Sequence, residues 1–109
     1  MTQRFELGEL VPDFYQALGR ANAAVGNTGV DPLIHELVKI RASQLNGCAF
    51  CLDMHIADAR KLGEEQRRLD VLAGWREAPI LFSEAEMAAI AMINAYNRIA
   101  VSTRKPPAA

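Results

Sequence analysis

Apolar residues recur at spacings of three and four along most of the chain, and no stretch alternates regularly between apolar and polar residues. The first spacing is typical of amphipathic helices, whereas alternation is typical of half-buried strands. The pattern predicts helices over residues 12–25, 32–45, 48–63, 64–75 and 83–102. We therefore expect an all-α fold.

Several predicted helix boundaries carry their own signals. Asp31 and Pro32 are suited to a helix start, since an Asp oxygen can accept free backbone N–H groups and proline fits the first helical position. Gly47 supplies a turn after the second predicted helix. Ser83 and Glu86 have the spacing of a capping box, in which each side chain accepts a hydrogen bond from the other's backbone N–H.

The apolar residues differ in distribution between the first and the last predicted helix. In the first they form one stripe, made of Phe14, Ala17, Leu18, Ala21 and Val25. The last, about 83–102, has almost no polar face for two turns, so it must be covered on most sides. A chain of 109 residues can hardly do this alone. We expect this helix to form an oligomer interface, with a central position in a small bundle as the alternative.

Length and composition indicate one globular domain over residues 1–109, with a short tail at 104–109 that we expect to fray. Half of the residues are hydrophobic and 23% are charged, which is typical of a folded protein. The formal net charge is −1 and there is no basic block, so the composition argues against a nucleic-acid partner.

No segment approaches the roughly 20 apolar residues of a membrane span, and the N-terminal residues lack the apolar stretch of a signal peptide. We therefore expect a cytoplasmic protein without a membrane partner. In a reducing cytoplasm, a Cys-x-x-Cys pair is more often catalytic or metal-binding than a permanent disulfide.

The segment NGCAFCLDMH contains both cysteines of the chain and one of its two histidines. If a helix begins at Cys48, then Cys48, Cys51 and His55 share one face of it. The first turn of a helix stabilises thiolates, and a histidine one turn after a cysteine can accept its proton. A sulfenic acid on one cysteine could be captured by the other as a disulfide. Which thiol attacks first stays open on these grounds.

Glu36 enters through the expected geometry of a tight turn at Gly47. That turn makes the second and third predicted helices antiparallel, which brings Glu36 level with His55. A carboxylate there would orient the imidazole ring and stabilise imidazolium, completing a Glu–His–Cys relay. The alternatives are that Glu36 is a solvated charge, paired with Lys39 or Lys61, or that Asp58 orients His55 instead.

The cysteine motif could also have a function other than redox chemistry. Haem attachment needs His directly after the second cysteine, where Leu52 stands. A structural zinc site needs a fourth ligand, which only His35 could supply alongside Cys48, Cys51 and His55. Two small buried residues beside an incidental histidine are a further alternative. We expect no metal and no cofactor.

The segment ELVKIRASQLNGCAFCLDMHIADARKLGE resembles the core of the AhpD-like alkylhydroperoxidase and carboxymuconolactone decarboxylase superfamily. The shared pattern is a Glu twelve positions before the first cysteine of Cys-x-x-Cys-x-x-x-His, with Gly-Glu further along the chain. The similarity extends over a core motif at 31–75 and to INAYNRIAVSTR near the C-terminus. It implies an AhpD-like helical bundle whose subunits form trimers or hexamers.

The resemblance also implies a thiol peroxidase acting on organic hydroperoxides or hydrogen peroxide. It assigns the peroxidatic role to Cys51, the resolving role to Cys48 and the proton relay to His55 and Glu36. The resulting disulfide would be reduced by a lipoylated or thioredoxin-like partner. The decarboxylase branch works without this cysteine pair, so the pair argues against a lactone substrate.

Two features depart from the family pattern. Phe50 stands where relatives have His or Tyr, and it cannot relay a proton. The C-terminal half is shortened, because residues 79–83 replace about two helices of the relatives. These departures favour the alternative of a non-enzymatic redox-sensing or structural helical oligomer. A zinc-stabilised module is a further alternative.

Overall fold

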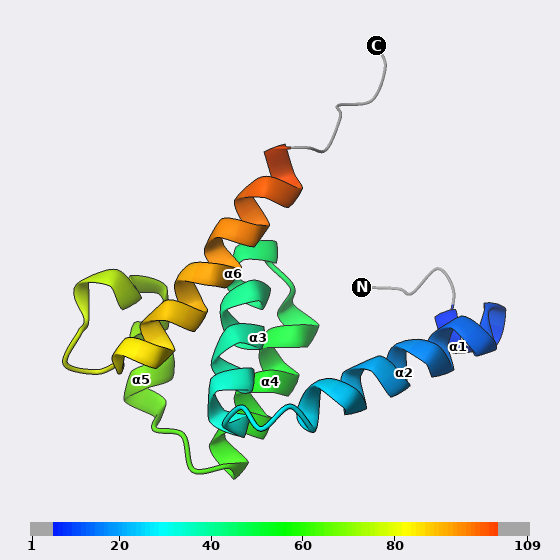
Figure 1. The fold of residues 1–109 in the computed structure, drawn as a ribbon, viewed down its shortest axis with the longest axis horizontal. Helices are drawn as coiled ribbons and strands as arrows, with labels where there is room; N and C mark the ends of the chain where they lie inside the picture. The colour runs from blue at the N-terminus through cyan, green and yellow to red at the C-terminus, as the bar shows by residue number, and fades with distance from the viewer. Residues whose placement is uncertain (1–5, 103–109) are drawn as a thin grey trace. The chain divides into compact units, whose positions relative to one another are not determined.

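The structure is a computed structural model that describes residues 6–102, and the expected frayed tail at 104–109 lies outside them. The regular elements in the described part are all helices, which confirms the all-α fold (Figure 1). The chain divides into two compact units, Met1–Val30 and Asp31–Ala109. The expectation of a single domain over 1–109 stays a prediction.

The first unit contains the short helix α1, Leu7–Leu10, and the longer helix α2, Pro12–Gly26. Helix α2 confirms the predicted helix at 12–25, and a proline at its start suits the first helical turn. Its apolar stripe, which includes Phe14 and Leu18, is exposed. The four-residue α1 was not predicted, because so short a segment carries no periodicity to detect.

The second unit begins with the helices α3, Pro32–Asn46, and α4, Ala49–Lys61. Asp31 caps α3, since its Oδ1 accepts a hydrogen bond from the Leu33 N–H at 2.9 Å. Gly47 ends α3 with φ +65°, a left-handed conformation that glycine adopts without steric cost. The two helices lie side by side on either side of this turn, as the sequence predicted (Figure 1).

The predicted helix at 64–75 is two elements in the structure. Helix α5 spans Gln66–Val71, and a 3₁₀-helix, η1, spans Leu72–Glu77. Gly74 departs from helical geometry with φ −103° and ψ 26°, so the chain is kinked inside η1. The apolar spacing is similar for the two helix types over so few residues, which is why the pattern merged them.

The last helix, α6, spans Glu84–Ser102 and is tied to α5 at its start. Ser83 and Glu86 form the predicted capping box: the Ser83 N–H donates to Glu86 at 2.7 Å and the Glu86 N–H donates to the Ser83 Oγ at 3.2 Å. Arg68 forms ion pairs with both Glu86 and the buried Glu64. These contacts fix the position at which α6 begins.

Helix α3 packs against both α4 and α6, and it forms the centre of the second unit (Figure 1). The hydrophobic core draws on every helix of that unit: Leu37, Ile40, Ala59, Leu69, Leu72, Trp75, Phe82 and Ile90. Burial of these side chains is the main term that stabilises the unit.

Helix α6 is covered on one face only. Ile90 and Asn94 are buried, whereas Met92 and Tyr96 are exposed by 64% and 68%. The second unit therefore does not itself cover the apolar surface that the sequence showed on this helix. Among residues 6–102, no helix combines the length and apolar composition needed to cross a membrane.

Candidate functional site

Cys48 and Cys51 are joined by a disulfide at the start of α4, with their Cα atoms 5.3 Å apart. Cys48 is the N-cap residue and has an extended backbone conformation. Its Sγ accepts a hydrogen bond from the Cys51 N–H at 3.2 Å. Both residues are half-buried. The sulfur of Cys48 therefore occupies the position of an N-cap oxygen, where backbone donors favour negative charge.

His55 lies one turn after Cys51 on the same helix and contacts Glu36 of α3. The Nδ1 atom of His55 is 3.1 Å from Oε2 of Glu36, and the two side chains are 18% and 12% exposed. Glu36 thus reaches His55, as the antiparallel pairing of α3 and α4 implied. The catalytic roles of the four residues stay predictions.

The contact with Glu36 orients the imidazole. An ionised carboxylate only accepts hydrogen bonds, so Nδ1 of His55 carries a proton and donates it. In the neutral ring, Nε2 is then the atom that can accept a proton from a thiol. Lys39 lies 3.7 Å from the other carboxylate oxygen of Glu36, so one of the alternative pairings also exists. The carboxylate serves both partners.

Asp58 joins Glu36 and His55 in a compact group whose oxygen and nitrogen atoms lie within 4.8 Å of one another. Within the described part of the chain, these three side chains are the ones placed closely enough to hold a metal ion together. Neither cysteine belongs to the group. His35 lies outside it as well. The arrangement differs from a zinc site made of two cysteines and two histidines.

The surface beside the disulfide is apolar. Phe50, between the two cysteines, is 77% exposed, and Met54 on the next turn is 42% exposed. An exposed aromatic ring next to the cysteine pair offers a surface for an apolar molecule or partner. It provides no group that can transfer a proton.

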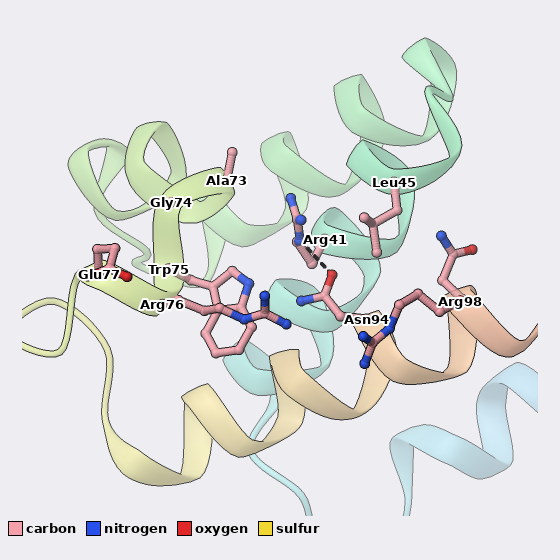
Figure 2. Close-up of a pocket in the computed structure, with 10 residues that line it drawn as sticks. Arg41, Leu45, Ala73, Gly74, Trp75, Arg76, Glu77, Asn94 and Arg98 are labelled. Atoms are coloured by element: carbon pink, nitrogen blue, oxygen red, sulfur yellow. Dashed lines mark hydrogen bonds between the residues drawn. The ribbon is translucent and has the colours of Figure 1, made fainter.

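Sequence reasoning missed a second concave site, which lies between α3, η1 and α6 and contains three arginines (Figure 2). Its residues come from three separate stretches of the chain, so no local motif announces it. The only signal in the sequence is a set of isolated arginines, two within predicted helices and Arg76 in the break after 64–75.

Comparisons with known proteins show the family to which the chain belongs. The sequence model of the carboxymuconolactone decarboxylase family matches residues 12–95. The uncharacterized protein YdfG of Bacillus subtilis is 39% identical over 90 residues, which cover 83% of this chain and 60% of YdfG. The alkyl hydroperoxide reductase AhpD of Hyphomonas neptunium is 39% identical over 70 residues, which cover 60% of this chain and 39% of that protein. The chain thus spans 60% or less of these curated relatives.

A solved structure shares the fold over nearly the whole chain. It is the crystal structure of a protein of unknown function from Agrobacterium tumefaciens, for which a role as the antioxidant defence protein AhpD has been suggested. The TM-score is 0.68 and the identity is 26%, with 98% of this chain and 100% of that one covered.

Proposed function

The chain belongs to the carboxymuconolactone decarboxylase family, with an AhpD-like fold and cysteine motif, and from this premise we propose that it is a thiol peroxidase that reduces organic hydroperoxides or hydrogen peroxide. The observation that carries the proposal is the disulfide at the start of α4 together with the hydrogen bond between His55 and Glu36. The cysteine pair and the histidine that would accept a thiol proton therefore belong to the same helix, α4, and its N-cap.

The oxidative step begins with both cysteines reduced. His55 accepts the thiol proton of Cys51 at Nε2, and the resulting thiolate attacks the terminal oxygen of the hydroperoxide. An S–O bond forms as the O–O bond breaks, and the alkoxide takes the proton from the imidazolium to leave as an alcohol. Glu36 holds the ring and stabilises its positive charge during the transfer. Cys51 is left as a sulfenic acid.

The second step forms the disulfide seen in the structure. The Cys48 thiolate attacks the sulfenic sulfur, and hydroxide leaves and becomes water on protonation. The hydrogen bond from the Cys51 N–H to the Cys48 sulfur supports the thiolate form of this resolving cysteine. A dithiol partner, lipoylated or thioredoxin-like, then reduces the disulfide by thiol–disulfide exchange. The sum is one hydroperoxide reduced to alcohol and water per dithiol oxidised.

The proposal includes a cytoplasmic setting and a homo-oligomer, a trimer or hexamer. A reducing compartment would keep the pair cycling rather than locked as a disulfide. The exposed Met92 and Tyr96 on α6 support an interface there, because a second copy would cover apolar surface that the second unit leaves open.

One observation favours a second candidate, a redox-sensing subunit that oxidises without rapid turnover. Phe50 lies beside the reactive pair and has no group that can supply a proton to the departing alkoxide. In that case the disulfide would form once and persist until a reductant removed it. Sustained consumption of peroxide separates the two candidates.

The experiment is steady-state consumption of cumene hydroperoxide with excess dihydrolipoamide as the reductant. We expect turnover by the wild-type chain and none above background for Cys51→Ser. Ala49→Ser is the matched control, because it places a serine at an exposed position between the cysteines and should leave turnover unchanged. Undiminished turnover by Cys51→Ser would contradict the proposed chemistry.

A further inference from the structure

The second concave site is a cavity of about 460 Å³ between α3, η1 and α6. This volume is typical of pockets for small molecules. Three arginines line it, one from each element: Arg41 from α3, Arg76 from η1 and Arg98 from α6. Figure 2 shows their guanidinium groups gathered around Asn94.

The cavity carries an excess of positive charge. Glu77 is the carboxylate among its lining residues, against the three arginines. Within residues 6–102, the ion pairs involve other basic side chains and none of these arginines. Burial lowers the pKa of Arg41, and the positive charge of Arg76 lowers it further, which shows that the two cations repel each other in a partly desolvated place. An anion would relieve this repulsion.

Arg41 and Arg76 are held in position before any ligand enters. Arg41 donates from Nε to the Asn94 Oδ1 at 3.2 Å and from Nη1 to the Gln44 Oε1 at 2.9 Å. Asn94 is itself 8% exposed, so this anchor is buried. Arg76 lies over the Trp75 ring, 5.1 Å from its centroid. Guanidinium groups fixed in this way lose little entropy when they bind a ligand.

We propose that this pocket binds a small oxyanion with two or more negative charges, either a phosphate or an organic dicarboxylate. Planar guanidinium groups match the oxygen pairs of both through parallel N–H···O bonds. The Asn97 amide, which also lines the cavity, adds further hydrogen-bonding capacity. The pocket shares no residue with the Glu36–His55–cysteine site, so the proposal does not rest on the peroxidase activity.

The test is isothermal titration calorimetry of the full chain with inorganic phosphate and, separately, with malonate, at ionic strength held constant with sodium chloride. Trp75 is the chain's single tryptophan and lines the cavity, so its fluorescence reports on the same titration. We expect saturable binding of at least one anion, with Kd about 1 mM or lower. Arg76→Gln and Arg98→Gln, both at exposed positions, should weaken it about tenfold or more.

The matched control is Arg67→Gln, which removes an exposed arginine outside the cavity and should leave Kd unchanged. Binding of phosphate alone identifies a phosphoryl ligand, binding of malonate alone identifies a carboxylate ligand, and binding of both supports a general oxyanion site. The proposal is overturned if neither anion binds to the wild-type chain. It is also overturned if both pocket variants bind as tightly as the Arg67→Gln control.

Discussion

His55 and Glu36 lie nineteen residues apart in sequence, yet their Nδ1 and Oε2 atoms are 3.1 Å apart in the structure. The turn at Gly47 makes this contact, because it folds α4 back along α3. The contact matters chemically since it directs one ring nitrogen toward the carboxylate and leaves the other for proton exchange. A relay of this kind makes predictions that differ from those of an isolated Cys-x-x-Cys pair.

Removing the imidazole should move the pH dependence of thiol reactivity. In His55→Ala, the midpoint of the alkylation profile of Cys51 should shift to higher pH, because the imidazole no longer accepts the thiol proton or, as imidazolium, stabilises the thiolate. The measurement is the rate of iodoacetamide labelling of the reduced chain across pH, resolved by peptide mass. His35→Ala, the change at the chain's other histidine, is the control. Superimposable profiles for both variants and the wild type would argue against the relay.

The carboxylate that orients His55 can be identified by comparing two isosteric changes. Glu36→Gln should lower kcat/KM for hydroperoxide by about a hundredfold, within the range of general acid–base catalysis. Asp58→Asn should cost far less, because Glu36 is the carboxylate that accepts the hydrogen bond from His55. A larger loss for Asp58→Asn would show that Asp58, not Glu36, is the functional carboxylate. Equal losses would show that Glu36 has no special role in orienting His55.

Phe50→Tyr should increase peroxide turnover several-fold. The side chain is largely exposed, so the added hydroxyl is accommodated without repacking and places a proton donor beside the disulfide. Phe50→Leu, which changes the ring without adding a hydroxyl, is the comparison. If the Tyr variant turns over no faster than the wild type, the His55 imidazolium or solvent water already supplies the proton.

The capping box at the start of α6 should make stability sensitive to acid. Burial alone would raise the pKa of Glu86, but hydrogen bonds from Ser83 and Arg68 outweigh it and lower that pKa below its ordinary value. A lowered pKa in the folded state contributes stability that is present at neutral pH and is lost as pH falls through the folded value.

Glu86→Gln should therefore reduce the free energy of unfolding by about 1 kcal/mol near neutral pH, the usual size of a capping effect. The difference from the wild type should shrink as pH drops below the ordinary carboxyl pKa of about 4.3. Urea unfolding at neutral pH and again below the ordinary carboxyl pKa measures this difference, with the exposed Glu84→Gln as control. A difference that stays constant with pH would contradict the role of the Glu86 charge.

Local signals in the sequence located most of the helices. Asp31 and Ser83 mark helix starts through side-chain caps, and Gly47 marks an end through its positive φ, all of which act within a few residues. Because Gly47 makes the connection tight, the contact between His55 and Glu36 also followed from counting residues. This contact between distant residues could be predicted because a single short turn sets the distance between the two helices' residues.

Other features depend on packing that no local pattern reveals. The division of 64–75 into α5 and η1 arises at Gly74, whose conformation the apolar spacing does not record. The arginine-lined cavity needs three elements to be placed together, and Arg41, Arg76 and Arg98 carry no shared motif. The burial of a single face of α6 was likewise not evident, because hydrophobicity alone does not say which face of a helix its own unit covers.

The central claim is that Cys48 and Cys51 cycle between a dithiol and a disulfide at the expense of a hydroperoxide. The most direct measurement is the intact mass of the reduced chain after thiol alkylation, before and after one equivalent of an organic hydroperoxide. The account predicts that both alkylation sites disappear together, and that excess dithiol restores both. If both thiols remain alkylatable after the peroxide is added, the cysteine pair is not a peroxidase centre.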